Sequence, residues 1–234
     1  MILRVENINT YYGASHILQD VSLEVGQGEV VCLLGRNGVG KTTTLRSIMG
    51  LTPPRRGRIL LMERDIAGLA PHHVARSGVG YVPDDRRVFA ELTVEENLEL
   101  ARRSAGARDG AWTLEKVLGL LPALRRLASR RGRHLSGGEQ KMLSIGRALM
   151  TSPSLLLLDE PSEGLSPIVV RSLVEIVRTI RGEKVTILMA DQNLKFSRLV
   201  ADRAYILEKG AVQHAGTLDA IYADEEIVRR YLAV

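Results

Sequence analysis

A glycine-rich segment early in the chain has the residue types and spacing that hold a phosphate group. Residues 35–42 read Gly-Arg-Asn-Gly-Val-Gly-Lys-Thr and fit the pattern G-x-x-x-x-G-K-[ST] between an apolar run and a helical pattern. The glycines let successive backbone N–H groups point inward, and the following helix adds the positive end of its dipole. We expect Lys41 to reach the β- and γ-phosphates of a nucleotide and Thr42 to bind Mg²⁺. The expected phosphate-binding residues are Gly35, Arg36, Asn37, Gly38, Val39, Gly40, Lys41, Thr42 and Thr43.

Two adjacent carboxylates, Asp159 and Glu160, follow the apolar run Leu155–Leu158. The end of a buried strand is where α/β sheets place their ligand sites. We expect Asp159 to hold Mg²⁺ through water and Glu160 to polarise the water that attacks the γ-phosphorus. This division of roles requires adjacent carboxylates in different environments.

A second helix start with exposed backbone N–H groups is predicted at residues 135–140, Leu-Ser-Gly-Gly-Glu-Gln. A serine cap followed by two glycines makes a second anion site in the same chain. The expected nucleotide-binding residues of this segment are Ser136, Gly137, Gly138 and Glu139.

Together these motifs resemble the ATPases of ABC transporters, whose signature is a sequence of the L-S-G-G-Q type, and the resemblance covers residues 1–234. It implies that two ATPase subunits pair head to tail, so that the signature of one covers the γ-phosphate held by the other. It also implies that Tyr12 stacks on the adenine of ATP. The loop that contacts the partner subunit falls on residues 161–166, with Ser166 where an aspartate is common.

The chain departs from the general family pattern at two positions. Asp84 stands where most relatives have a glutamine that touches Mg²⁺, and Gln192 stands where most have a histidine. Asp84 is shorter and charged, so it is expected either to approach the metal or to pair with Arg86 and Arg87. Gln192 can hydrogen-bond a γ-phosphate but cannot carry a proton, and it joins Lys41 and Glu160 as a catalytic residue.

These departures are similar to those of LivF-type ATPases of branched-chain, or hydrophobic, amino acid importers. The similarity is carried by residues 81–89, 160–165 and 191–194. It implies transmembrane permease subunits and a second ATPase subunit, sister or self, as partners, and indirectly a solute-binding protein. It also implies a peripheral place on the cytoplasmic face of the membrane. The solute touches other subunits, so the substrate follows by analogy alone.

The composition is that of an ordinary globular protein, with 234 residues, 45% hydrophobic and 25% charged. The longest obvious apolar run is far shorter than the roughly 18 residues of a membrane span, and the start lacks the pattern of a secretory signal. We therefore expect a cytoplasmic protein. The single cysteine, Cys32, excludes disulfide scaffolds and cysteine-based zinc sites.

An α/β fold is predicted: a P-loop ATPase core with a parallel sheet, an N-terminal antiparallel β part and a helical insertion. Residues 93–150 show helical patterns and no convincing strand, with possible capping boxes at Thr93 and Ser136. Ser166 as cap and Pro167 begin a further helix. The predicted organisation is one domain, residues 1–234, with a nucleotide-binding core at 1–88 and 154–234 and a helical signature subdomain at 89–153. The expected strands are Val21–Val25, Glu29–Leu34, Ile59–Met62, Val79–Val82, Leu155–Leu158, Val185–Ala190 and Tyr205–Leu207.

The charge of +5 leaves a second function open, a soluble ABC-type ATPase acting on nucleic acid or ribosomes. Such proteins usually have two ATPase units or a long coiled coil, whereas this chain has one phosphate loop, so no nucleic acid is expected. A regulatory subunit without turnover is disfavoured by Glu160. The helical insertion carries arginines that form a solvated face, a few of which are expected to grip the permease. They are Arg102, Arg103, Arg108, Arg125, Arg126, Arg130, Arg131 and Arg133.

Overall fold

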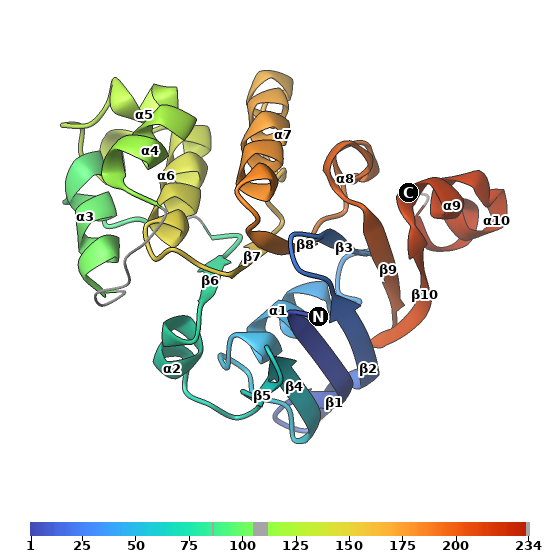
Figure 1. The fold of residues 1–234 in the computed structure, drawn as a ribbon. Helices are drawn as coiled ribbons and strands as arrows, with labels where there is room; N and C mark the ends of the chain where they lie inside the picture. Colours follow the sequence, from blue (N-terminus) through green and yellow to red (C-terminus); the bar gives the residue numbers. More distant parts are fainter. Residues whose placement is uncertain (86, 105–111, 233–234) are drawn as a thin grey trace.

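The computed structural model describes residues 1–85, 87–104 and 112–232, which form two sheets and a separate group of helices (Figure 1). The first sheet is antiparallel, in the order β2-β1-β4-β5. The second has the order β10-β9-β3-β8-β7-β6 and is parallel except at β10. The predicted parallel sheet and N-terminal antiparallel part are therefore confirmed.

Each predicted segment falls on a strand, although β2 begins at Ser15 rather than Val21, and β4 ends one residue before the expected Met62, which has a φ of 47°. Strands β5 and β10 were not predicted. The bounds of the strands are β1 (Leu3–Tyr12), β2 (Ser15–Val25), β3 (Val30–Leu34), β4 (Arg56–Leu61), β5 (Arg64–Asp65), β6 (Val79–Val82), β7 (Leu155–Asp159), β8 (Thr186–Ala190), β9 (Arg203–Glu208) and β10 (Ala211–Thr217).

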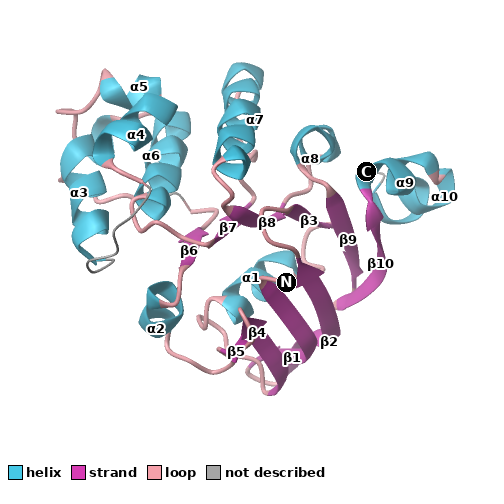
Figure 2. Cartoon of the chain, viewed as in Figure 1, coloured by secondary structure: helices cyan, strands magenta, loops and turns pink. Residues whose placement is uncertain are grey.

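The helices fall into groups that Figure 2 separates clearly. Helices α3 to α6 stand together at one side, α7 and α8 cover one face of the parallel sheet, and α1 lies between the two sheets (Figures 1 and 2). Their bounds are α1 (Lys41–Ile48), α2 (Pro71–Arg76), α3 (Val94–Ser104), α4 (Leu114–Leu120), α5 (Pro122–Arg125), α6 (Gly137–Leu149), α7 (Pro167–Gly182), α8 (Leu194–Val200), α9 (Leu218–Ala223) and α10 (Glu225–Ile227).

The central parallel strands β3 and β7 are buried at every position because both faces of the sheet are covered. Successive side chains enter opposite cores. Cys32 and Leu34 join the core that packs against α6 and α7, whereas Val31 and Leu33 join the core formed with α1 and the antiparallel sheet. The strand ends, where the candidate site lies, are therefore held from both sides.

The three predicted helix caps are confirmed in position. Thr93 and Glu96 exchange hydrogen bonds of 2.7 and 3.2 Å before α3, and Ser136 and Glu139 form a capping box at α6. Ser166 is likewise the N-cap residue of α7 and Pro167 is its first helical residue, although the Ser166 hydroxyl accepts no hydrogen bond from the described residues of the first turn. Pro167 lacks an N–H group, so that helix has one donor fewer to satisfy.

The helical insertion packs against the core through apolar side chains, including the buried Trp112 just before α4. Residues 105–111, and with them Arg108, lie outside the described residues, as does Arg86. No helix of the described ranges is long and apolar enough to cross a bilayer.

Candidate functional site

The phosphate-loop segment lies between β3 and α1, as predicted from its sequence. Its turn depends on glycine at Gly35, where φ is 139° and an added Cβ would stand 2.4 Å from the Leu207 carbonyl oxygen. The Lys41 ammonium is buried and folds back over the loop, donating hydrogen bonds to the carbonyl oxygens of Gly35 at 2.8 Å and Arg36 at 3.2 Å. The Lys41 ammonium therefore lies against the loop that was predicted to bind phosphate.

Asp159, at the end of β7, lies beside Thr42 at the start of α1. The Thr42 hydroxyl donates to Asp159 Oδ1 at 2.9 Å, and the Tyr81 hydroxyl donates to Oδ2 at 3.1 Å. Burial raises the pKa of Asp159, while these two bonds oppose the shift. Tyr81 is a contact that the sequence did not reveal, because it comes from β6, far away along the chain.

The oxygens of Thr42 and Asp159 fit Mg²⁺, which prefers oxygen ligands and usually keeps several waters. In the described ranges, no group of three or more His, Cys, Asp or Glu side chains is arranged to hold a metal by itself. A metal here would therefore need phosphate oxygens to complete its ligands, as in sites that bind Mg²⁺ together with a nucleotide.

Glu160 has an unusual position. Its φ of 42° lies in the left-handed region, which costs a non-glycine residue free energy. Its Oε1 is 3.2 Å from the Lys41 ammonium, whereas Oε2 is buried with no hydrogen-bond partner among the described residues. Burial raises the pKa of the Glu160 carboxyl group, and Lys41 opposes the rise. Strain, an unsatisfied oxygen and a raised pKa are features of a residue poised to accept a proton.

Asp191 fixes the loop after β8, next to the loop that follows Glu160. Its Oδ1 accepts hydrogen bonds from the Ser162 hydroxyl at 3.0 Å and the Asn193 N–H at 2.7 Å, and its Oδ2 accepts from the Ser162 N–H at 3.2 Å. Gln192 is exposed beside this buried anchor. The sequence drew attention to Gln192, whereas the structure gives Asp191 the larger structural role.

The signature segment begins α6, and its geometry differs from the expectation in one respect. The Ser136 N–H, expected to be open for an anion, donates to Glu139 Oε2 at 2.7 Å, and the Glu139 N–H donates to Ser136 Oγ at 3.4 Å. A capping box therefore occupies this donor, because a neighbouring carboxylate reaches it through one helical turn. An anion must displace Glu139 to use it.

Two expected contacts around the site are placed as follows. Tyr12 is 44% exposed, and its hydroxyl accepts a hydrogen bond from Thr52 at 3.4 Å. Asp84 is exposed after β6. The expected pairing of Asp84 with Arg87 was wrong, because Arg87 pairs at 2.5 Å with Asp85, the residue that follows Asp84.

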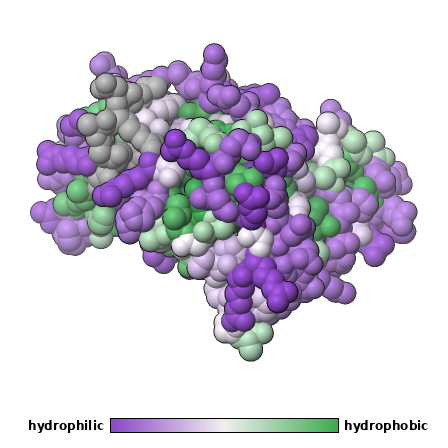
Figure 3. All heavy atoms as spheres, turned by 60° about the horizontal axis from the view of Figure 1, so that its bottom comes forward, coloured by the Kyte–Doolittle hydropathy of each residue, from purple (hydrophilic) through white to green (hydrophobic). Residues whose placement is uncertain are grey.

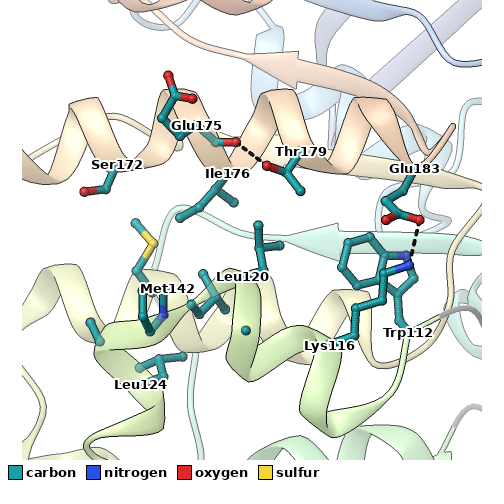
Figure 4. Close-up of a pocket in the computed structure, with 14 residues that line it drawn as sticks. Trp112, Lys116, Leu120, Leu124, Met142, Ser172, Glu175, Ile176, Thr179 and Glu183 are labelled. Atoms are coloured by element: carbon teal, nitrogen blue, oxygen red, sulfur yellow. Dashed lines mark hydrogen bonds and ion pairs between the residues drawn. The ribbon is translucent and has the colours of Figure 1, made fainter.

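Among the hollows of the described residues, one lies away from these strand ends and another borders the end of β6. The first, of 610 Å³, is a mainly apolar cavity between α7 and helices α4 to α6, and none of the expected site residues lines it. Figure 4 shows the Lys116–Glu183 ion pair closing one end of this cavity, with the two charged groups 2.6 Å apart. Its lining is that of a junction between helices rather than of a phosphate site.

The second hollow is a groove of 640 Å³ between the parallel sheet and the helical insertion. Leu51, Phe89 and Leu100, all exposed large hydrophobic residues, lie along it. The Arg147 guanidinium stands 4.4 Å from the centre of the Phe89 ring, and its Nε is buried without a partner among the described residues. The groove thus combines apolar surface with a cation.

Most of the described insertion arginines lie on an exposed face, as expected. Arg102 pairs with Glu99 at 2.8 Å, and Arg131 and Arg133 pair with Glu91 at 3.4 and 3.0 Å. Such exposed pairs contribute little to stability.

Comparison with known proteins finds relatives that match this chain over nearly its whole length. Residues 18–163 match the family model described as ABC transporter. The chain is 41% identical to the high-affinity branched-chain amino acid transport ATP-binding protein BraG of Pseudomonas aeruginosa, over 99% of each chain. It is 38% identical to the lipopolysaccharide export system ATP-binding protein LptB of Acidithiobacillus ferridurans, over 99% of this chain and 96% of that protein.

A third relative is the probable branched-chain amino acid transport ATP-binding protein LivF of Archaeoglobus fulgidus, which is 33% identical over 100% of this chain and 99% of that protein. Among solved structures, one described as an ATP binding subunit of an ABC transporter superposes with a TM-score of 0.85. It is 33% identical in sequence, and the match covers 97% of this chain and 94% of that one.

Proposed function

The chain belongs to the ABC transporter family of ATPases, and from that premise we propose that it hydrolyses Mg²⁺-bound ATP to drive a permease for branched-chain or other hydrophobic amino acids. The observation that carries the proposal is the meeting of Lys41, Asp159 and Glu160 at one edge of the parallel sheet. One cation on a phosphate loop, one metal-binding carboxylate and one strained base are what hydrolysis of a γ-phosphate requires.

We assign the nucleotide contacts to the residues of the phosphate loop. The N–H groups of residues 35–43 surround the phosphates, Lys41 moves from its loop carbonyls to the β- and γ-phosphates, and Tyr12 stacks on adenine. Thr42 and Asp159 would hold Mg²⁺, and Asp84 offers a further carboxylate nearby. When bound, the metal supplies positive charge that neutralises the phosphates.

In this proposal, the Lys41–Glu160 contact of 3.2 Å keeps the base inactive before nucleotide binds. Each charge neutralises the other while no phosphate is present. A bound phosphate competes for Lys41 and releases Glu160 to accept a proton from the attacking water. Gln192 positions the γ-phosphate through its amide and takes no proton.

We propose that two such subunits pair head to tail, so that the signature of each faces the γ-phosphate of the other. The residues that would cover it are Ser136, Gly137, Gly138 and Glu139. The capping box supports a role upon pairing, because Glu139 holds the Ser136 N–H until a stronger anion arrives. The second subunit is either a copy of this chain or a sister chain.

The groove described above is the proposed contact with the permease. Its occupant would be a short helix of the permease that ends in a carboxylate, since the groove offers apolar side chains and the incompletely bonded Arg147. Figure 3 turns the lower side of Figure 1 forward and shows hydrophobic surface gathered near the middle of a hydrophilic periphery. In this proposal, residues 1–88 and 154–234 bind nucleotide, and the helical part at 89–153 transmits its state.

The substrate is proposed from the names of the relatives. BraG and LivF favour branched-chain amino acid uptake, with a solute-binding protein as an indirect partner and a place on the cytoplasmic face of the membrane. LptB favours lipopolysaccharide export as a second candidate. None of the relatives named here is described as acting on nucleic acid.

Transport in proteoliposomes tests the proposal. The chain is assembled with branched-chain amino acid permease subunits or with lipopolysaccharide export subunits, and ATP-dependent leucine uptake or lipopolysaccharide release is measured. We expect leucine uptake with the wild-type chain and none with Glu160→Gln. Stimulation of the ATPase only by the export subunits would replace the amino acid assignment with the second candidate.

A further inference from the structure

Lys141 is a buried lysine to which the proposed mechanism gives no role. It lies in α6, five positions after Ser136, and its side chain is among the largest fully buried ones, at 1% exposure of the residue. Its ammonium donates hydrogen bonds to the Asp159 carbonyl oxygen at 3.0 Å and to the Pro83 carbonyl oxygen at 3.2 Å. A buried charge is retained only where its hydrogen bonds compensate the loss of water.

The two carbonyl groups belong to the ends of two neighbouring strands. Asp159 ends β7 and carries the proposed metal-binding carboxylate, and Pro83 follows β6 directly before Asp84. The Asp159 side chain is bonded to Thr42 and Tyr81. Through its backbone it is also bonded to α6, so the metal-binding position is mechanically joined to that helix.

Helix α6 begins at the signature segment. Ser136 and Lys141 are separated by five residues, or roughly 7.5 Å along a helix, and α6 is packed in the apolar core over much of this length. A displacement of the strand ends after β6 and β7 therefore moves the start of α6 through a rigid connection.

We propose that Lys141 is a positioning residue that transmits the state of the chain's own metal and phosphate site to its own signature segment. This inference rests on the proposed head-to-tail pairing, in which that signature acts on the nucleotide of the other subunit. Lys141 thereby couples the two ATP sites of the pair, although it touches neither nucleotide.

Two substitutions of Lys141 distinguish a loss of communication between the two ATP sites from a loss of packing in α6. Lys141→Met keeps the length and the apolar stem of the side chain but removes both hydrogen bonds, whereas Lys141→Gln keeps an amide donor. Leu143→Ala serves as the control for a weakened helix, because Leu143 is fully buried in α6 and donates no side-chain hydrogen bond. All variants are measured in the assembled transporter, together with melting temperatures.

The steady-state ATPase rate as a function of ATP concentration provides the readout. We expect Lys141→Met to lower kcat about tenfold with KM changed less than about twofold, and to bring the Hill coefficient to one from a higher wild-type value. Lys141→Gln should retain kcat within about threefold of wild type. Leu143→Ala should lower the melting temperature without changing the Hill coefficient.

Wild-type kcat and Hill coefficient in Lys141→Met would overturn the inference. An equal fall of the Hill coefficient in Leu143→Ala would also overturn it, because packing alone would then explain the effect. The test is distinct from that of the proposed function, which fails if Glu160→Gln hydrolyses ATP at the wild-type rate, whatever the Lys141 variants do.

Discussion

Replacing Glu160 by glutamine should make the nucleotide-free protein more stable at neutral pH while abolishing turnover. In the wild type, Glu160 is 9% exposed, and its Oε2 has no hydrogen-bond partner among the described residues. A buried polar atom without a partner costs ~1–3 kcal/mol, and more when the group is charged. The neutral amide of glutamine relieves the charged part of this cost. The substitution removes the charge but also the Lys41 ion pair, while Lys41 keeps two carbonyl acceptors. We expect a net gain of ~1 kcal/mol, or ~2–4 °C in melting temperature for a chain of this size.

The pH dependence of this gain follows from the pKa of Glu160, which burial raises above its ordinary value of 4.5. A raised pKa means that the folded protein holds the proton more tightly than the unfolded chain. The contribution of Glu160 to wild-type stability therefore falls as the pH rises from 4.5 through the folded-state pKa of this group. The advantage of Glu160→Gln should be small at pH ~4.5 and reach its full size at neutral pH.

Thermal unfolding without nucleotide, recorded in steps from pH ~4.5 to ~8, measures this difference. Glu24→Gln is the matched control, because it makes the same carboxylate-to-amide change at an exposed glutamate on β2. The ATPase rate of Glu160→Gln should fall ~10²- to 10⁴-fold, as for the loss of a general base. The reasoning would be refuted if Glu160→Gln were less stable than wild type at neutral pH. It would also be refuted if the difference in melting temperature between the two proteins did not change with pH.

Three further substitutions test the other parts of the site. Lys41→Ala should abolish tight ATP binding in a fluorescence titration, because it removes the cation placed on the phosphate loop; near-normal affinity would contradict the loop assignment. Gly137→Asp should bind ATP almost normally as a monomer yet fail to dimerise or hydrolyse it, since its carboxylate repels the partner's γ-phosphate; loss of binding in the monomer would count against a shared site. Gln192→Ala should slow hydrolysis by about three- to tenfold, the loss of an uncharged hydrogen bond of ~0.5–1.5 kcal/mol, and a thousandfold loss would show that Gln192 does more than position.

The parts of the site that the sequence predicted are those carried by contiguous residues. Residues 35–42 contain the glycines of the turn, the Lys41 ammonium and the Thr42 hydroxyl in one segment. The predicted order of strand, loop and helix was therefore enough to place Lys41 and Thr42 at the start of the helix. The capping boxes at Thr93 and Ser136 were equally local, with both partners three residues apart.

The contacts that the sequence did not predict join residues distant along the chain. Tyr81 reaches Asp159, and Lys141 reaches both Asp159 and Pro83, through the pairing of β6 with β7 and the packing of α6. No periodicity or spacing encodes such pairs, because tertiary packing alone determines them. The Asp84–Arg87 prediction failed for a related reason, since local charge order could not decide between Asp84 and Asp85 as the partner.

The most direct test of the account is the structure of the Glu160→Gln variant with Mg²⁺ and ATP bound. We expect the Lys41 ammonium to leave the carbonyl oxygens of Gly35 and Arg36, and its position beside residue 160, and to bind oxygens of the β- and γ-phosphates. Thr42 and Asp159 should both face the metal, with the substituted side chain at position 160 facing the γ-phosphate. A Lys41 ammonium that stays on its own loop carbonyls while ATP is bound would contradict the account.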